Sequence, residues 1–427
     1  MTDNTIVFAD LTHTGKKLDA TFMPLAVSYI ASYFKSQRPD AEVELFKYPT
    51  DLATYLAAND VRVAAFSDYC WNERLSLGFA RAIKKMSPRT VTIFGGPNCP
   101  YDPAEIAAFL GERPGVDFYV AGEGEIAFVE LYDALAAVDF DVARLKRAGT
   151  QVSNTRYLDG DGQLVCGPML PRMNDLDVIP SPYLSGMMDK FFDGRLTPMI
   201  QNARGCPYSC TFCHDGLEYM TKYRRFDHGR ICDEIDYVKD RKKGPALCIV
   251  DDNFGIHKND LAVAKKIGAI RTDTGWPNFI SYGGTAKNNK ERIVEISREM
   301  GDAIEAGASV QSTDADVLAS IKRSNISTVT ISDMARKVAE NGVTSFTENI
   351  LCLPGDTIEK HQHSVYEMMD LDIQDFKLFQ FILLPGTEAA STAHREKFAY
   401  ATAWRVFPRC FGHYEVGGER FSVAEAS

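Results

Sequence analysis

The sequence predicts an α/β chain with an N-terminal doubly wound, Rossmann-like (flavodoxin-like) domain followed by a partial (β/α)6 barrel of the TIM type. Three observations predict this fold. Short apolar segments alternate with amphipathic ones over residues 5–135, a proline-rich break follows, and the alternation resumes at Pro198. Such alternation is typical of parallel sheets covered by helices. We place the first domain at residues 1–140 and the barrel at residues 195–390.

Five short apolar segments are the predicted strands of the first domain. Helical patterns between them, such as Pro24–Phe34 and Leu75–Lys85, carry apolar residues at i, i+3 and i+4. Ligands of such sheets bind beyond the carboxyl ends of the strands, so the loops that follow the strands are the expected site. The predicted strands are Thr5–Leu11, Val43–Phe46, Val61–Ser67, Val91–Phe94 and Phe118–Ala121.

Residues 141–194 are expected to connect the two domains. Arg156–Val165 alternates apolar and polar residues on both sides of a glycine-rich turn, which predicts a small hairpin. The prolines of residues 168–198 predict an ordered linker.

The barrel is predicted from the strand–helix units that begin near Pro198. Six such units indicate a barrel rather than a second open sheet. Residues 391–427 are expected to be a short tail that resembles the start of a further, truncated region. The predicted barrel strands are Met199–Asn202, Ala246–Asp251, Asn278–Tyr282, Ala306–Gln311, Ser345–Leu351 and Phe376–Leu383.

The composition is that of a folded protein that does not bind nucleic acid. Hydrophobic residues make up 45% of the chain and charged residues 25%, and the formal net charge is −11. Binding to nucleic acid phosphates needs a basic surface instead. The sequence contains neither the apolar run of a membrane helix nor a signal peptide after Met1. We therefore expect a cytoplasmic protein.

A cluster of three cysteines is the strongest functional signal. Cys206, Cys210 and Cys213 follow the first predicted barrel strand, where the active-site loops of such barrels lie. Thiolates favour iron–sulfur clusters, zinc or Cu(I). Structural zinc and electron-transfer clusters normally take four protein ligands, whereas three leave one metal position open for a small molecule. The alternative is a structural zinc site that His214 completes.

The cysteine loop resembles the signature of the radical S-adenosylmethionine (SAM) superfamily, C-x3-C-x-(aromatic)-C, with Phe212 as the aromatic residue. The resemblance implies a [4Fe–4S] cluster held by Cys206, Cys210 and Cys213, with SAM chelated to the fourth iron. It also implies that reduction of the cluster cleaves SAM to methionine and a 5′-deoxyadenosyl radical.

Later strand ends are similar to the SAM-binding elements of this superfamily. Ile249–Phe254 resembles a D-D-x-F element near the SAM amino group, although paired acids that cap a helix are the alternative interpretation. Ser309–Ser312 resembles the region at the SAM ribose, and the segment from Glu348 to Thr357 resembles an element ending in L-P-G-E-T. The SAM contacts that the resemblance implies are Phe212, Asp251, Asp252, Gln311, Ser312 and Glu348.

The first domain resembles that of the cobalamin (B12)-binding branch of the superfamily, the class B methyltransferase-like enzymes. The resemblance lies in the order of the domains and in two strand-end segments, with Asn98 where many members carry histidine. It implies a cobalamin without a protein imidazole on its lower face. The alternative is a Rossmann-like domain with ordinary tight turns and no ligand. The implied cobalamin residues are Gly95, Gly96, Pro97, Gly122, Glu123, Gly124 and Glu125.

The resemblance implies a cobalamin-dependent radical SAM methyltransferase that methylates an unactivated carbon of a small molecule or natural product. An external electron donor of the flavodoxin or ferredoxin type would reduce the cluster. The first alternative is a radical rearrangement or oxidative cyclisation without methylation. The second is a non-catalytic iron–sulfur protein that carries electrons or binds a ligand. The catalytic residues and the substrate are not predicted.

Overall fold

The computed structural model describes residues 5–282, 286 and 289–426. The chain divides into two compact units, which we describe separately. The first unit comprises Met1–Lys190, Leu384–Gly386 and Ala401–Ser427, and the second comprises Phe191–Leu383 and Thr387–Tyr400.

The first unit is built on one sheet with the strand order β2-β1-β3-β4-β5-β6-β7. Strands β1 to β5 are parallel, and their order is that of a flavodoxin-like doubly wound sheet. The predicted fold class of this unit is therefore confirmed. The strands are β1 (Thr5–Ala9), β2 (Glu42–Phe46), β3 (Val63–Ser67), β4 (Val91–Gly95), β5 (Phe118–Val120), β6 (Thr155–Leu158) and β7 (Leu164–Cys166).

Helices cover both faces of this sheet. Successive residues of β1 point to opposite faces, so neighbouring side chains contact different helices. The ring of Phe8 lies 4.7 Å from that of Phe128 in α5, centroid to centroid. Its neighbour Val7 belongs instead to a core cluster with Leu52 of α2 and Phe79 of α3. The helices are α1 (Leu25–Gln37), α2 (Pro49–Ala58), α3 (Glu73–Met86), α4 (Pro103–Gly111), α5 (Glu125–Ala136) and α6 (Val142–Arg147).

The predicted hairpin is present, but it extends the sheet instead of standing apart in a linker. Strands β6 and β7 are antiparallel to each other, and β6 pairs with β5. The hairpin thereby covers the edge of β5, whose backbone groups would otherwise lack partners. As a result the first compact unit runs to Lys190, past the boundary expected at residue 140.

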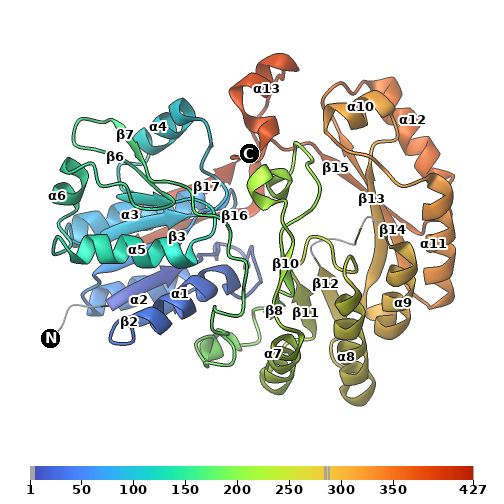
Figure 1. Ribbon diagram of the computed structural model, residues 1–427, viewed down its shortest axis with the longest axis horizontal. Coiled ribbons are helices and arrows are strands. Elements are labelled where there is room, and N and C mark those ends of the chain that lie inside the picture. Colours follow the sequence, from blue (N-terminus) through green and yellow to red (C-terminus); the bar gives the residue numbers. More distant parts are fainter. Residues whose placement is uncertain (1–4, 283–285, 287–288, 427) are drawn as a thin grey trace. The chain divides into compact units, whose positions relative to one another are not determined.

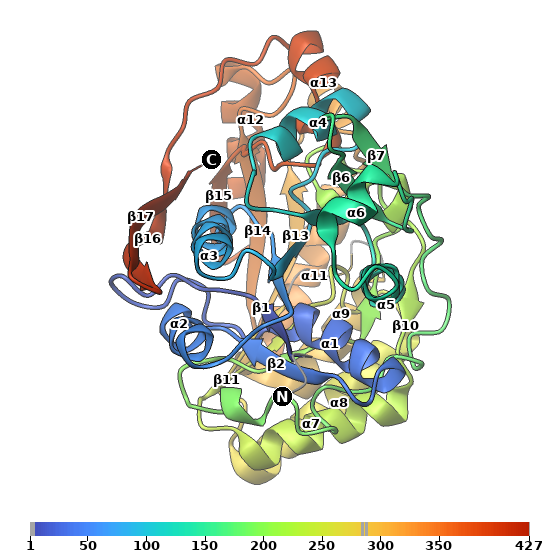
Figure 2. The ribbon, with the colours of Figure 1, turned by 90° about the vertical axis from the view of Figure 1, so that its left-hand side faces the viewer.

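The residues expected to form a short tail end in an ordered hairpin that packs on the first unit. Strands β16 (Val406–Val416) and β17 (Glu419–Ala426) are antiparallel and lie beside α3 (Figure 2). A Cβ atom at Gly78 would lie 2.3 Å from the Phe421 ring, so the glycine allows the strand to approach the helix. Tyr414 and Val416 are part of the core of this unit.

The second unit carries six parallel strands in two groups, β8-β11-β12 and β13-β14-β15. Within the described residues no pairing joins β12 to β13. All six predicted barrel strands are present, so the partial barrel is confirmed. The strands are β8 (Met199–Ile200), β11 (Ala246–Ile249), β12 (Phe279–Tyr282), β13 (Glu305–Gln311), β14 (Thr344–Leu351) and β15 (Asp375–Gln380).

Helices surround these strands on the outside (Figure 1). The longest of them, α8, begins at a capping box between His257 and Asp260 and ends at Gly275, which is left-handed (φ +73°). None of the helices in the described part of the chain combines the length and the apolar character of a membrane span. The helices are α7 (His228–Arg241), α8 (Lys258–Thr274), α9 (Lys290–Met300), α10 (Ala315–Ser320), α11 (Thr328–Glu340), α12 (Ile358–Met369) and α13 (Thr392–Lys397).

Candidate functional site

The cysteine loop is held by its backbone. It follows β8 and the two-residue strand β9 (Ala203–Arg204). The Thr211 N–H donates to the carbonyl of Ile321 at 3.2 Å, and the Cys213 N–H donates to that of Cys210 at 3.2 Å. A Cβ at Gly216 would lie 2.2 Å from the Cys210 carbonyl oxygen. The loop can therefore fold this tightly only with glycine at that position.

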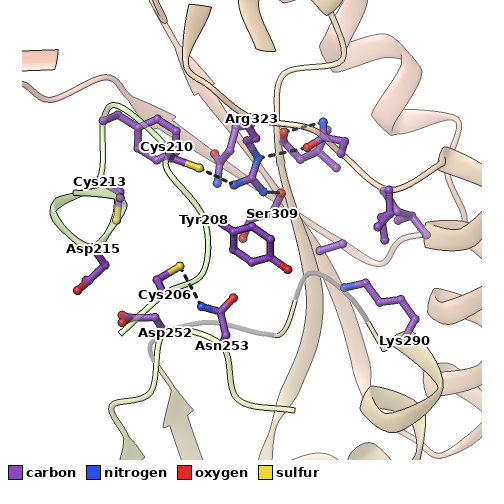
Figure 3. Close-up of a pocket in the computed structure, with 18 residues that line it drawn as sticks. Cys206, Tyr208, Cys210, Cys213, Asp215, Asp252, Asn253, Lys290, Ser309 and Arg323 are labelled. Atoms are coloured by element: carbon purple, nitrogen blue, oxygen red, sulfur yellow. Dashed lines mark hydrogen bonds between the residues drawn. The ribbon is translucent and has the colours of Figure 1, made fainter. Parts of the chain in front are cut away.

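The three cysteines border one cavity of about 180 Å³ (Figure 3). Phe212, Asp252 and Gln311 also line it, so half of the SAM contacts expected from the sequence come together with the thiols. Besides these six, the lining residues are Tyr208, Asp215, Gly216, Asn253, Lys290, Ala308, Ser309, Val310, Arg323, Asn325, Ile326 and Ile331.

Two side chains donate hydrogen bonds to the thiol sulfurs. Nδ2 of Asn253 lies 3.1 Å from Sγ of Cys206, and Nη1 of Arg323 lies 3.6 Å from Sγ of Cys210. Burial raises the pKa of Cys206 and raises that of Cys213 to about 12. Buried thiolates therefore need compensating positive charge, which metal ions bound to them supply.

The arrangement of the thiols bears on the choice between a cluster and zinc. Within the described residues, no three His, Cys, Asp or Glu side chains are close enough to hold one metal ion. His214 is not among the residues that line the cavity with the three cysteines. Thiols that border a cavity fit a cluster of several irons better than one zinc ion.

Strand β13 ends at the cavity in an irregular conformation. Its register with β14 shifts between Ser309 and Gln311, and Gln311 has a left-handed backbone (φ +68°). Oε1 of Gln311 is buried and accepts no hydrogen bond from the described residues. A buried acceptor without a partner is costly, and a non-glycine residue in this conformation is uncommon. Both features favour a ligand beside Gln311.

Arg323 and Asn325 hold this irregular strand end in place. The Arg323 guanidinium donates to the carbonyl oxygen of Ser309 and, at 3.2 Å, to Oδ1 of Asn325. Nδ2 of Asn325 donates to the carbonyls of Val310 at 2.9 Å and of Ser312 at 2.8 Å. The sequence analysis assigned no role to either side chain, because no motif surrounds them.

Three predicted SAM contacts do not line the cavity. Asp251 is buried, and its carboxylate accepts the backbone N–H groups of Asn202 at 2.8 Å and Ala203 at 3.1 Å. Ser312 bonds to Ser364, and Glu348 accepts the hydroxyl of Ser309. These three residues support the walls of the cavity, so their direct contact with SAM stays a prediction.

The predicted cobalamin residues lie in the first unit, after the neighbouring strands β4 and β5. Gly96 allows close packing there, since a Cβ would lie 2.3 Å from the Asp68 carbonyl oxygen. Glu123 accepts Nε of Arg172 at 3.0 Å, which ties the loop to the segment after the hairpin. Gly95 ends β4, Pro97 follows Gly96, Gly122 is left-handed, and Gly124 and Glu125 begin α5.

The residues at the β3 and β1 strand ends are compatible with the predicted site. The rings of Tyr69 and Trp71 stack with centroids 4.5 Å apart, and Trp71 is partly exposed. His13 is fully buried, and both its ring nitrogens have partners, Tyr414 Oη at 2.9 Å and Glu425 Oε1 at 3.1 Å. Both partners belong to the C-terminal hairpin, so His13 joins the end of β1 to that hairpin.

Asp68, at the end of β3, is expected to make stability depend on pH. Burial, and next the charge of Glu73, raise its pKa from 3.8 to about 7. The folded protein then holds a proton that the unfolded chain has released, so stability falls as the pH rises from about 4 to about 7. We expect Asp68→Asn, which cannot ionise, to flatten this fall in urea unfolding measured across the interval. An equally steep fall in the variant would contradict the assignment.

Comparison with known proteins identifies both units. The model of the B12 binding domain matches residues 14–132, and that of the Radical SAM superfamily matches residues 201–365. The chain carries a radical SAM domain. A B12-binding domain precedes it.

Similar proteins of this superfamily are longer than the chain. The cobalamin-dependent radical SAM methyltransferase TokK of Streptomyces tokunonensis is 29% identical over 92% of this chain and 59% of TokK. The 2-(S-pantetheinyl)-carbapenam-3-carboxylate methyltransferase of Streptantibioticus cattleyicolor is 32% identical over 86% of this chain and 54% of that enzyme. The chain thus spans somewhat more than half the length of these curated relatives.

A solved structure supports the fold. The radical SAM methyltransferase TsrM from Kitasatospora setae superposes with a TM-score of 0.67 at 15% identity. The match covers 94% of this chain and 78% of TsrM. At this identity the likeness establishes the shared radical SAM fold and no more.

Proposed function

We propose that this chain is a cobalamin-dependent radical SAM methyltransferase that methylates an unactivated carbon of a small molecule. The observation that carries the proposal is the pairing of a B12-binding domain with a radical SAM domain whose three signature cysteines border one cavity. When bound, the reduced cluster would supply the electron that cleaves SAM, and cobalamin would carry the methyl group.

In this proposal each cavity residue has a definite task. Cys206, Cys210 and Cys213 would hold three corners of the cluster. Asp215 and Asp252 line the same cavity as the thiols, and their negative charge would attract the positively charged sulfonium of SAM. Gln311 would accept a hydrogen bond from SAM through its buried Oε1.

The proposal for the first unit rests on its strand-end loops. Gly95–Pro97 and Gly122–Glu125 follow neighbouring parallel strands, at the edge where doubly wound sheets bind ligands. The stacked rings of Tyr69 and Trp71 would offer an apolar surface to a corrin ring. We further propose a cytoplasmic protein that receives electrons from a flavodoxin or ferredoxin.

The test measures both products of SAM. Anaerobically reconstituted chain, given cobalamin, dithionite and methyl-labelled SAM, is expected to release S-adenosylhomocysteine and 5′-deoxyadenosine. Release of 5′-deoxyadenosine without S-adenosylhomocysteine, and without transfer of the labelled methyl group from SAM, would exclude methyl transfer. It would favour the rearrangement or cyclisation. Absence of SAM cleavage would favour a non-catalytic iron–sulfur protein.

Asn253 is expected to tune the cluster through Cys206. Hydrogen bonds to cluster sulfurs raise the reduction potential, and loss of such a supporting contact typically costs about 10–100-fold in activity. We expect Asn253→Ala to slow SAM cleavage by about this factor and to lower the midpoint potential in a titration followed by electron paramagnetic resonance. Asn259→Ala, in the first turn of α8, is the control. An unchanged potential in Asn253→Ala would refute the tuning role.

A further inference from the structure

The charges that line the cavity are divided between its two sides. Asp215 and Asp252 lie beside the thiols, whereas Lys290 lies across the cavity from Cys213 (Figure 3). The methionine end of SAM must lie against the thiols if it is to reach an iron that they hold. The side of Lys290 is therefore the side open to a second molecule.

Lys290 has hydrogen-bonding capacity left for a ligand. It is the first residue of α9, and its Nζ donates to the carbonyl of Ala286 at 2.9 Å and that of Gly307 at 3.5 Å. An ammonium group carries three N–H donors, so two carbonyl partners leave one. Among the described residues no carboxylate lies within 4 Å of Nζ to neutralise its charge.

Arg323 adds a second cation to the lining of the same cavity. Its guanidinium bonds to the Ser309 carbonyl, to Asn325 and to Cys210, and in the described part of the chain no carboxylate pairs with it. Burial, and then the charge of Arg323, lower the pKa of Lys290 to about 8. Two cations that line one partly enclosed cavity are stabilised when an anion binds between or beside them.

We propose that Lys290 binds a carboxylate of the molecule that is methylated, so that the substrate is an organic acid. This inference rests on the proposed function, because it assumes that SAM occupies the thiol side. Arg323 adds electrostatic attraction for the carboxylate at longer range. Its hydrogen bond to Cys210 holds its guanidinium on the thiol side of the cavity. A carboxylate suits this position, because it accepts a hydrogen bond from the Lys290 ammonium and neutralises its charge.

The experiment uses acetate as the probe, because it is small enough to enter wherever water does. Binding of ¹³C-labelled acetate to the reconstituted chain is measured by saturation-transfer NMR, with and without saturating SAM, and acetamide is the neutral control. We expect acetate and not acetamide to bind, together with SAM. We expect Lys290→Gln to weaken acetate binding about tenfold, Lys290→Arg to retain it, and Lys266→Gln, a lysine that pairs with Asp236 and does not line the cavity, to match the wild type.

Other outcomes overturn the inference. Displacement of acetate by SAM, with weaker SAM binding in Lys290→Gln, would assign the carboxylate to SAM itself. Equal acetate binding in wild type and Lys290→Gln, or none in either, would show that Lys290 is not an anion site. SAM cleavage is measured on the same samples, so failure of the proposed function is seen separately as a wild type that does not cleave SAM.

Discussion

Replacing Cys213 with alanine is expected to remove the iron–sulfur cluster and to reduce SAM cleavage to the level of protein without iron. The physical reason is the number of ligands. Three thiolates hold three corners of a four-iron cluster, and a loop with two leaves a second iron unligated by protein. Alanine has no atom that can replace the sulfur. The same result is expected for Cys206 and Cys210, since all three border the cavity.

Iron content, visible absorption and 5′-deoxyadenosine release measure the effect on matched samples. The control is Cys232→Ala, because Cys232 lies on α7, where its Sγ contacts Nε2 of His228 at 3.5 Å, and it is absent from the cavity lining. A Cys213→Ala protein that retained its cluster and cleaved SAM at the wild-type rate would refute the assignment. One zinc ion and no iron in the wild-type protein would favour the zinc alternative.

The barrel could be predicted from the sequence because its strands are short apolar runs between amphipathic helices. Ala246–Ile249 illustrates this, since Leu247, Cys248 and Ile249 are all buried. Parallel strands covered on both faces give such continuous apolar runs. The three-cysteine site could also be predicted from the sequence, because its residues are close together in the chain and lie on one tight loop.

The roles of Asp251 and Asp252 were not separable in the sequence. Both were predicted to contact SAM, but only Asp252 lines the cavity. Asp251 turns instead to the backbone N–H groups of Asn202 and Ala203. Neighbouring residues at a strand end point in opposite directions, so one carboxylate can face the cavity while the next supports the strand beside it.

Lys290 and Arg323 could not be found from local patterns. Lys290 begins α9 and Arg323 follows the end of α10, and basic residues are common at both kinds of position. Only the return of the chain to the same end of the barrel brings them to the cysteines. The C-terminal hairpin did leave a signal: Cys410, Tyr414 and Val416 recur with the period of a strand and are buried. Pro408 interrupts that pattern, and the sequence analysis did not assign a strand there.

Removing the carboxylate of Glu425 is expected to destabilise the first unit by about 3–5 kcal/mol. Glu425, in β17, is almost completely buried, as is His13. Its oxygens accept Nε2 of His13 at 3.1 Å and the backbone N–H groups of Arg74 and Leu75, each at 3.0 Å. These two N–H groups belong to the first turn of α3, which has no side-chain cap from its own N-cap residue.

Glu425→Ala would leave three donors without this acceptor, and the loss costs about 1–3 kcal/mol for each donor that is buried. The carboxylate also balances the partial positive charge at the helix N-terminus, so its loss acts on the hairpin and on α3 together. Urea unfolding measures the change. The matched control on the same hairpin is Glu415→Ala, an exposed partner of Arg420, for which we expect a change below about 1 kcal/mol. Equal effects of the two variants would mean that the hairpin is held by Tyr414, Val416 and Phe421 through apolar packing alone, with the buried carboxylate contributing nothing.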